Sequence, residues 1–384
     1  MAYSTEFLIL GGGVIGCAAA RELAKSGHKV LILERGEPCR EASWAAAGAL
    51  IARALSPDEG PLLDFKVRSL ALFREHSREL TEETGIDTGF RETGGIDFFL
   101  SEEEIEQVPE FLEWQARAGI PAEPLSESEL RAREPQLNPE IRHGVFFPTF
   151  TQVRTPWYTR ALLASALHHG AGLETHIEAR EFLMEGDRVA GVRTDRGEVF
   201  AETTLLCAGP WSTELARLLG RQLPGVPVKG QIILLVDRAR PVNHIVHYGK
   251  TYITPRDEGR MVVGSTEEWV AFQRGNTAEG IETLLHQSRF FYPGLGRASV
   301  EHVWHGFRPL TVDGLPYIGA FDHLPGLLVA TGHYRSGIIL APLTARVVTE
   351  LLESRPLSFD IAAFSPERVA GMKEVELGER RDLH

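Results

Sequence analysis

Three glycines near the start of the chain have the spacing of a phosphate-binding turn. Gly11-x-Gly13-x-x-Gly16 follows the apolar run Phe7–Leu10 and opens a segment with helical periodicity. In such a turn the first glycine permits the bend, the second lets the backbone approach a pyrophosphate, and the third lets helix and strand pack closely. The start of the helix then presents unpaired N–H groups to the phosphates. The motif therefore predicts a dinucleotide site at the end of the first strand.

An acidic residue lies at the position that a dinucleotide site requires. Glu34 ends a second apolar run, Val30–Leu33, at the distance from the glycines where an acidic residue accepts hydrogen bonds from ribose hydroxyls. Its negative charge would repel a 2′-phosphate. A glycine turn that binds no nucleotide is the alternative, and the strand–turn–helix–strand context argues against it.

Three further segments have compositions suited to contact with a bulky ligand. Ala42–Ala49 and Leu206–Trp211 are rich in small residues, which let a backbone pass close to a cofactor. Plain alanine packing is favoured for the first on these residues alone, and an ordinary strand-to-helix turn explains the second equally well. Thr331–Pro342 is a glycine-bracketed polar loop before a final helix, whose dipole could stabilise negative charge on a reduced cofactor. His333 in this loop is by itself more typical of a structural hydrogen-bonding group than of a catalyst.

One arginine is a candidate for binding a carboxylate. Arg308 lies within Trp304–Pro316, among apolar residues, glycines and prolines. An arginine in such surroundings either pairs with a carboxylate of the core or binds the carboxylate of a ligand through two parallel hydrogen bonds. The residues alone favour neither of these two alternatives.

The sequence lacks the patterns of several other kinds of active site. It contains no Gly-x-Ser-x-Gly elbow, no Gly-x-x-x-x-Gly-Lys-Ser/Thr phosphate loop and no His-Glu-x-x-His. Its histidines and its three cysteines have no metal-ligand spacing, so we expect no metal.

Composition narrows the class of protein. The chain has 384 residues, 43% hydrophobic and 24% charged, with a formal net charge of −13. This is ordinary globular composition, and the length suggests two domains or three. The acidic balance argues against nucleic-acid partners and against docking on an anionic membrane. Because cysteines are scarce, no signal peptide is visible and the longest near-apolar stretch, Trp44–Ala52, is too short to span a bilayer, we expect a soluble cytoplasmic protein.

The elements that would position these residues alternate between strands and helices at both ends of the chain. We expect strands at 7–10, 29–34, several within 173–207, and at 231–236, 261–263 and 327–330. Helices are expected at 14–26, 62–85, 155–169, 278–291 and about 341–352, and Ser101 and Ser126 begin capping boxes that open two more. The strand–helix–strand start predicts a parallel sheet with a ligand at its carboxyl edge. We infer an α/β fold, with a nucleotide-binding domain assembled from discontinuous segments and a second domain inserted between them.

Taken together, the motifs resemble the glycine oxidases, a group within the D-amino-acid-oxidase family of FAD enzymes. The resemblance covers essentially the whole chain and includes, besides the glycine turn and Glu34, the segments Ala45–Gly48, Val228–Gln231, Tyr252–Arg256, Val262–Thr266, Arg308–Gly319 and Gly332–Gly337. It implies a Rossmann-like FAD-binding domain formed by residues 1–88, 142–222 and 300–384. It also implies a β-rich substrate-binding domain with a mixed or antiparallel sheet, formed by residues 89–141 and 223–299.

The resemblance also implies roles for individual residues. Arg308 would bind the substrate carboxylate, with Tyr252 and Arg335 nearby. FAD would be held non-covalently, since no cysteine follows Cys207 to form a thioether near the end of the chain. The residues implied to hold it are Gly11, Gly13, Val14, Ile15, Gly16, Glu34, Arg35, Ala42, Ser43, Ala47, Gly48, Ala49, Ala179, Gly209, His333, Tyr334, Arg335, Ser336, Gly337, Ile338 and Ile339.

The implied reaction is the oxidation of glycine, sarcosine or small D-amino acids by hydride transfer to flavin N5, with O2 as the acceptor. The products would be a 2-oxo acid (glyoxylate from glycine), ammonia or an amine, and H2O2, and the glycine imine would supply thiamine thiazole synthesis. The family suggests a homotetramer that acts without nucleic acid or membrane. Two residues depart from the family. Trp44 would lie beside the flavin, where the family usually has a small residue. Glu267 would lie at the mouth of the active site, where its charge could alter which substrate side chains are tolerated.

Two alternatives remain. A D-amino-acid dehydrogenase of the same fold would pass electrons to a quinone or carrier protein, and the sequence shows no membrane-docking helix, which counts against it. A flavin-binding module without turnover would need no substrate clamp, so Arg308 together with Tyr252 argues against that alternative.

Overall fold

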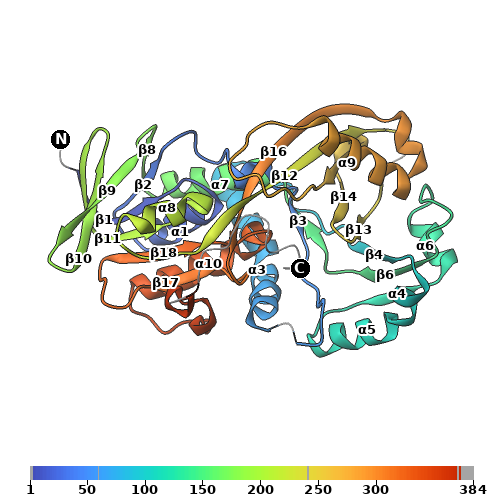
Figure 1. Cartoon of the computed structure of the whole chain (residues 1–384), viewed down its shortest axis with the longest axis horizontal. Helices are drawn as coiled ribbons and strands as arrows, with labels where there is room; N and C mark the ends of the chain where they lie inside the picture. Colours follow the sequence, from blue (N-terminus) through green and yellow to red (C-terminus); the bar gives the residue numbers. More distant parts are fainter. Residues whose placement is uncertain (1–2, 59, 240–241, 370–371, 373–384) are drawn as a thin grey trace.

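Two eight-stranded sheets form the framework of the protein, whose computed structural model describes residues 3–58, 60–239, 242–369 and 372 (Figure 1). The first sheet has the order β17 (Tyr317–Ala320), β18 (Leu327–Thr331), β11 (Gly197–Leu206), β1 (Tyr3–Leu10), β2 (Val30–Glu34) and β8 (Gly172–Thr175), with β10 (Arg188–Thr194) paired to β11 and β9 (Ala179–Glu185) paired to β10. The pairings β1–β2, β1–β11, β11–β18 and β2–β8 are parallel. The predicted parallel sheet is confirmed.

Helices cover one face of this sheet, and the apolar strand residues alternate between its two faces. The helices on this face are α1 (Val14–Lys25), α7 (Thr155–His168) and α10 (Gly337–Leu352), with α3 (Gly60–Thr84) packed on α7 and α10. Phe7 and Ile9 of β1 belong to the core beneath these helices, whereas Leu8 and Leu10 belong to the core on the opposite face. That second core includes Phe182 of β9 and a residue of α8 (Ser212–Arg217). A strand buried on both faces explains the unbroken apolar run that predicted it.

The second sheet is mixed, as the resemblance implied. Its order is β16 (Ser299–Thr311), β12 (Gly225–Val236), β15 (Arg260–Gly264), β14 (Thr251–Pro255), β13 (Ile245–Tyr248), β4 (Gly95–Phe99), β6 (His143–Phe147) and β5 (Glu123–Leu125). Only the β13–β4 pairing in this sheet is parallel. Helices α4 (Glu102–Glu106), α5 (Val108–Arg117), α6 (Glu127–Arg133) and α9 (Ala278–Phe291) lie around it (Figure 1).

Two of the expected domain boundaries do not match the hydrogen bonding of the sheets. Strands β6 and β16 lie within the ranges 142–222 and 300–384 expected for the nucleotide-binding part, yet both pair in the second sheet. Boundaries just after β6 and after β16 divide the sheets more naturally. The reason is that a strand's partner is set by contacts distant in sequence, which a local pattern does not contain. The range ends 1–2 and 373–384 lie outside the described residues.

Local helix signals are confirmed in three places and wrong in one. Ser101 and Ser126 each form the capping box that predicted α4 and α6, and α9 has the expected bounds. The final helix begins at Gly337, four residues before the expected start at Ala341. Pro342 lies inside α10, and the burial of Ile338, Ile339 and Leu340 stabilises the helical turn that precedes it.

Short elements connect the two sheets. They are the helix α2 (Ala42–Ala45), the strand pair β3 (Ala49–Leu50) and β7 (Thr151–Gln152), and the 3-10 turn η1 (Gly209–Trp211) that leads into α8. Among the described residues, no helix is both long and apolar enough to cross a membrane.

Candidate active site

The turn between β1 and α1 requires glycine at its first and third motif positions. Gly11 has a φ of +115°, and a Cβ there would lie 2.6 Å from the carbonyl oxygen of Cys207. A Cβ on Gly16 would lie 2.0 Å from the carbonyl oxygen of Gly11. The absence of both side chains lets α1 start directly above the strand ends, where its dipole points at the sheet edge.

The start of α1 is suited to an anion. Its N-cap, Gly13, supplies no side-chain cap, and the first turn contains no acidic residue. The N–H of Val14 donates to Ser43 Oγ at 2.9 Å, and the N–H of Gly12 donates to Glu34 Oε2 at 2.8 Å. Glu34 thus lies against the turn with lone pairs left for ribose hydroxyls. These features fit the pyrophosphate and ribose of a dinucleotide.

A cavity opens at this edge of the sheet, at the carboxyl ends of β1, β2, β11 and β18. It has a volume of about 390 Å³, within the usual range for ligand sites. The predicted cofactor residues that line it are Gly11, Gly13, Val14, Ile15, Glu34, Arg35, Ala42, Ser43, Ala179, Gly209, His333, Tyr334, Arg335, Gly337 and Ile338. Segments separated by more than 300 residues in the sequence therefore meet at one place, as the carboxyl-edge rule predicts.

Six predicted residues lie off the cavity, most of them with a packing role. Gly16 packs against the turn as described, and Ile339 belongs to the core beneath α10. Ala47 packs against the second sheet, and Gly48 approaches the backbone before α7 so closely that a Cβ would lie 2.1 Å from the carbonyl oxygen of Val153. The other two residues off the cavity are Ala49 and Ser336.

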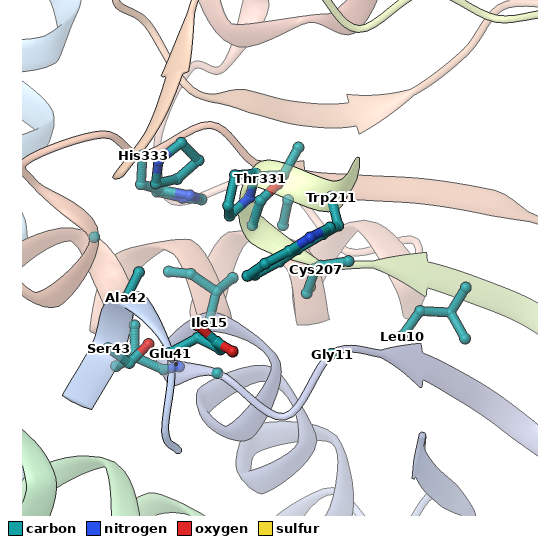
Figure 2. A pocket seen from close by; sticks show the side chains of 18 of the residues that line it. Leu10, Gly11, Ile15, Glu41, Ala42, Ser43, Cys207, Trp211, Thr331 and His333 are labelled. Carbon is teal, nitrogen blue, oxygen red and sulfur yellow. Dashed lines mark hydrogen bonds between the residues drawn. The ribbon is translucent and has the colours of Figure 1, made fainter. Parts of the chain in front are cut away.

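Trp211 is a prominent cavity residue in the segment Leu206–Trp211, of which the sequence analysis named only Gly209 as a cofactor residue. The Trp211 side chain is one of those that line the cavity (Figure 2). The Arg35 guanidinium lies 4.1 Å from the ring centre, and the ring of Phe272 stacks on Trp211 at 5.0 Å. Trp211 follows the end of β11, so the carboxyl-edge rule was the signal that could have found it. Further lining residues that were not individually predicted to hold FAD include Leu10, Leu33, Glu41, Ile177, Cys207, Leu215 and Thr331.

His333 lies in the loop before α10 and is buried. Burial lowers the pKa of its imidazole to about 3, so the ring is neutral at physiological pH. Its Nε2 lies 3.3 Å from Thr344 Oγ1 within the same helix region. The helix dipole therefore meets the cavity without a competing positive charge from His333.

Arg308 lies beside the cavity, and the next residue, Pro309, lines it. The Arg308 guanidinium extends over Gly230, where a Cβ would lie 2.1 Å from Nη2. It donates to Ser265 Oγ at 2.6 Å and to the carbonyl oxygen of Thr266 at 3.3 Å. Within the described part of the chain it forms no ion pair with a carboxylate, and burial lowers its pKa. A partly buried cation whose partners are all neutral is suited to bind an anion, which favours binding of a ligand carboxylate over pairing with a carboxylate of the core.

Tyr252 occupies the same face of the second sheet. Its ring lies over Gly264, where a Cβ would lie 2.5 Å from the phenolic oxygen. Ser265 follows Gly264, so the Tyr252 hydroxyl and the Arg308 guanidinium converge at the end of β15. Gly230 and Gly264 thus provide the space that both side chains need.

Two cations and an acid lie at the side of this cluster. Arg335 lines the cavity and pairs with Glu267, whose carboxylate also lies 3.4 Å from Lys250 Nζ. Glu267 is mostly buried, and its pKa is lowered despite burial because Arg335 and Lys250 stabilise its charge. Trp44, which was expected to lie beside the flavin, packs on Trp304 and is not among the residues that line the cavity.

Comparison with known proteins identifies similar sequences and similar structures. A family model described as DAO, FAD dependent oxidoreductase, matches residues 6–351. A glycine oxidase of Geobacillus kaustophilus is 36% identical over 380 residues, covering 98% of this chain and 100% of that protein. A bifunctional protein ThiO/ThiG of Synechocystis is 33% identical over 375 residues, covering 96% of this chain and 54% of the relative. The crystal structure of glycine oxidase from Geobacillus kaustophilus aligns with a TM-score of 0.91 at 34% identity, covering 95% of this chain and 99% of that one.

Proposed function

Because the chain belongs to the DAO family of FAD-dependent oxidoreductases, we propose that it catalyses the oxidative deamination of glycine. The observation that carries this proposal is Arg308, a partly buried guanidinium with neutral partners beside the FAD cavity. The names of the relatives support glycine as the substrate.

The residues of the chain would hold FAD along the sheet edge. The glycine turn and the start of α1 would bind the pyrophosphate, Glu34 the ribose, and the loop from His333 to Ile338 the flavin. When bound, FAD supplies an acceptor for the hydride that leaves the substrate Cα. Tests of individual cofactor residues can therefore use FAD affinity itself as the readout.

Arg308 would bind the substrate carboxylate through two parallel hydrogen bonds. Tyr252, whose hydroxyl lies at the end of β15 as the Arg308 guanidinium does, would orient the bound amino acid. The contribution expected of these residues is orientation, which can supply much of the rate enhancement when a bound cofactor performs the redox step. Glycine, O2 and water would then yield glyoxylate, ammonia and H2O2.

An oxygen assay tests whether O2 is the electron acceptor. We expect the purified holoenzyme to consume O2 with glycine and to release one H2O2 for each glyoxylate, because the imine hydrolyses and O2 takes the two electrons. Glyoxylate formed only when a quinone or another carrier is added, without peroxide, would contradict the oxidase proposal and favour the dehydrogenase.

The wider role proposed for the enzyme follows its relatives. The bifunctional name ThiO/ThiG of the Synechocystis relative supports a supply of glycine imine to thiamine thiazole synthesis. Sarcosine and small D-amino acids are proposed as further substrates. The cytoplasmic location and the homotetramer stay predictions.

A further inference from the structure

A row of polar side chains continues across the second sheet beyond Tyr252. Tyr252 on β14 is the cross-strand partner of His247 on β13, and His247 is the partner of Asp97 on β4. Partners in such a row point to the same face of a sheet, and adjacent strands are about 4.8 Å apart. His247 therefore lies one strand beyond Tyr252 on the face that carries the proposed substrate site.

The orientation of the His247 ring is fixed by Arg53 and Asp97. Arg53 pairs with Asp97 Oδ2 through Nη1 and lies 3.2 Å from His247 Nδ1 through Nη2. The other oxygen of Asp97, Oδ1, is buried without a hydrogen-bond partner and lies 3.6 Å from His247 Nδ1. Because arginine can only donate, Nδ1 of His247 must accept, and the proton of the neutral ring lies on Nε2.

The Nε2–H of His247 is available to a ligand. Within the described residues it has no hydrogen-bond partner in the protein, and 15% of the side chain is exposed. Burial and the charges of Arg53 and Arg335 lower the pKa of His247, so the ring stays neutral and keeps this tautomer. The Tyr252 hydroxyl and the Arg308 guanidinium converge at the end of β15, and Tyr252 is the cross-strand partner of His247, so His247 lies next to Tyr252 on the face of the sheet that Arg308 occupies.

We propose that His247 is a specificity-determining residue, whose Nε2–H donates a hydrogen bond to an oxygen on the side chain of the substrate. The proposal rests on the proposed function, since it takes Arg308 as the group that fixes the other end of the amino acid. The class of substrate favoured is a small α-amino acid with a hydroxyl or carbonyl oxygen near Cβ. An apolar side chain of equal size leaves this donor unpaired and is disfavoured.

The test compares D-serine with D-2-aminobutyrate, which differ by a hydroxyl in place of a methyl. Their relative kcat/KM, or their relative Ki against glycine where turnover is not measurable, is determined for the holoenzyme and its variants. We expect the wild-type enzyme to prefer D-serine, and His247→Leu to reduce that preference about tenfold. A ratio cancels any general loss of activity or of folded protein.

Two polar variants separate a donor from a merely structural side chain. The amide nitrogen of His247→Gln can occupy the place of Nε2 and should retain the preference, whereas His247→Asn is too short and should lose it. The exposed His286 on α9 gives the matched control His286→Leu, which should leave the ratio at its wild-type value.

A ratio that falls less than about threefold in both His247→Leu and His247→Asn overturns the inference, as does an equal fall in His286→Leu. An enzyme that oxidises glycine but shows either result refutes only the role of His247. An enzyme that binds FAD and oxidises neither glycine nor D-serine refutes the proposed function instead.

Discussion

Replacing Arg308 by alanine should leave FAD bound and lower kcat/KM for glycine about a thousandfold, equivalent to about 4 kcal/mol. The guanidinium has only neutral partners, Ser265 Oγ and two carbonyl oxygens, and no ion pair within the described residues. Its charge is therefore available to the substrate carboxylate, whose burial without a cation is costly. The measurement is steady-state oxidation of glycine together with the visible absorption of the bound flavin.

The matched control is Arg289→Ala. Arg289 is exposed on α9 and, among the described residues, donates to a carbonyl oxygen of its own helix, so this variant should retain wild-type kinetics. Normal glycine turnover by Arg308→Ala with FAD bound would show that the substrate is held elsewhere and that our assignment of the carboxylate site is wrong.

Gly230→Ala should lower kcat/KM for glycine about a hundredfold, mainly through a higher KM. A Cβ at this position would lie 2.1 Å from Nη2 of Arg308, so the guanidinium must move from its place above β12. The glycine has no positive φ, and the backbone of the strand accepts alanine. The expected loss therefore comes from a misplaced guanidinium in a folded enzyme with FAD bound.

Gly296 provides the control for this substitution. It lies in the second domain with an ordinary φ, and a Cβ there would meet only the flexible side chain of Arg289 at 3.3 Å. Gly296→Ala should keep the wild-type KM. A wild-type KM in Gly230→Ala would mean that the position of Arg308 above Gly230 does not matter for binding glycine.

Local signals in the sequence predicted much of the nucleotide-binding part. The apolar run Phe7–Leu10, the glycine turn and Glu34 are each determined by neighbours within one strand–turn–helix unit, and the structure places them as expected. The capping boxes at Ser101 and Ser126 are equally local, because each joins residues three apart.

The parts that sequence could not predict depend on contacts distant along the chain. The pairing of β16 with β12 places Arg308 above Gly230, and no pattern within either strand indicates this partner. For the same reason, the sequence around Arg308 could not show whether its guanidinium pairs with a carboxylate of the core or binds a ligand. Trp211 lies in a segment that the sequence analysis named but was given no role itself. A strand end followed by small residues is common, and only the assembled sheet edge identifies Trp211 as a lining residue.

The central claim is that this FAD-dependent oxidoreductase takes electrons from glycine. It is tested most directly by the visible spectrum of the purified protein before and after anaerobic addition of glycine. We predict flavin absorption bands that bleach with glycine and return when air is admitted. Flavin that stays oxidised after glycine is added would contradict the account. Bleaching only by another small D-amino acid would change the assigned substrate and leave the assigned site unchanged.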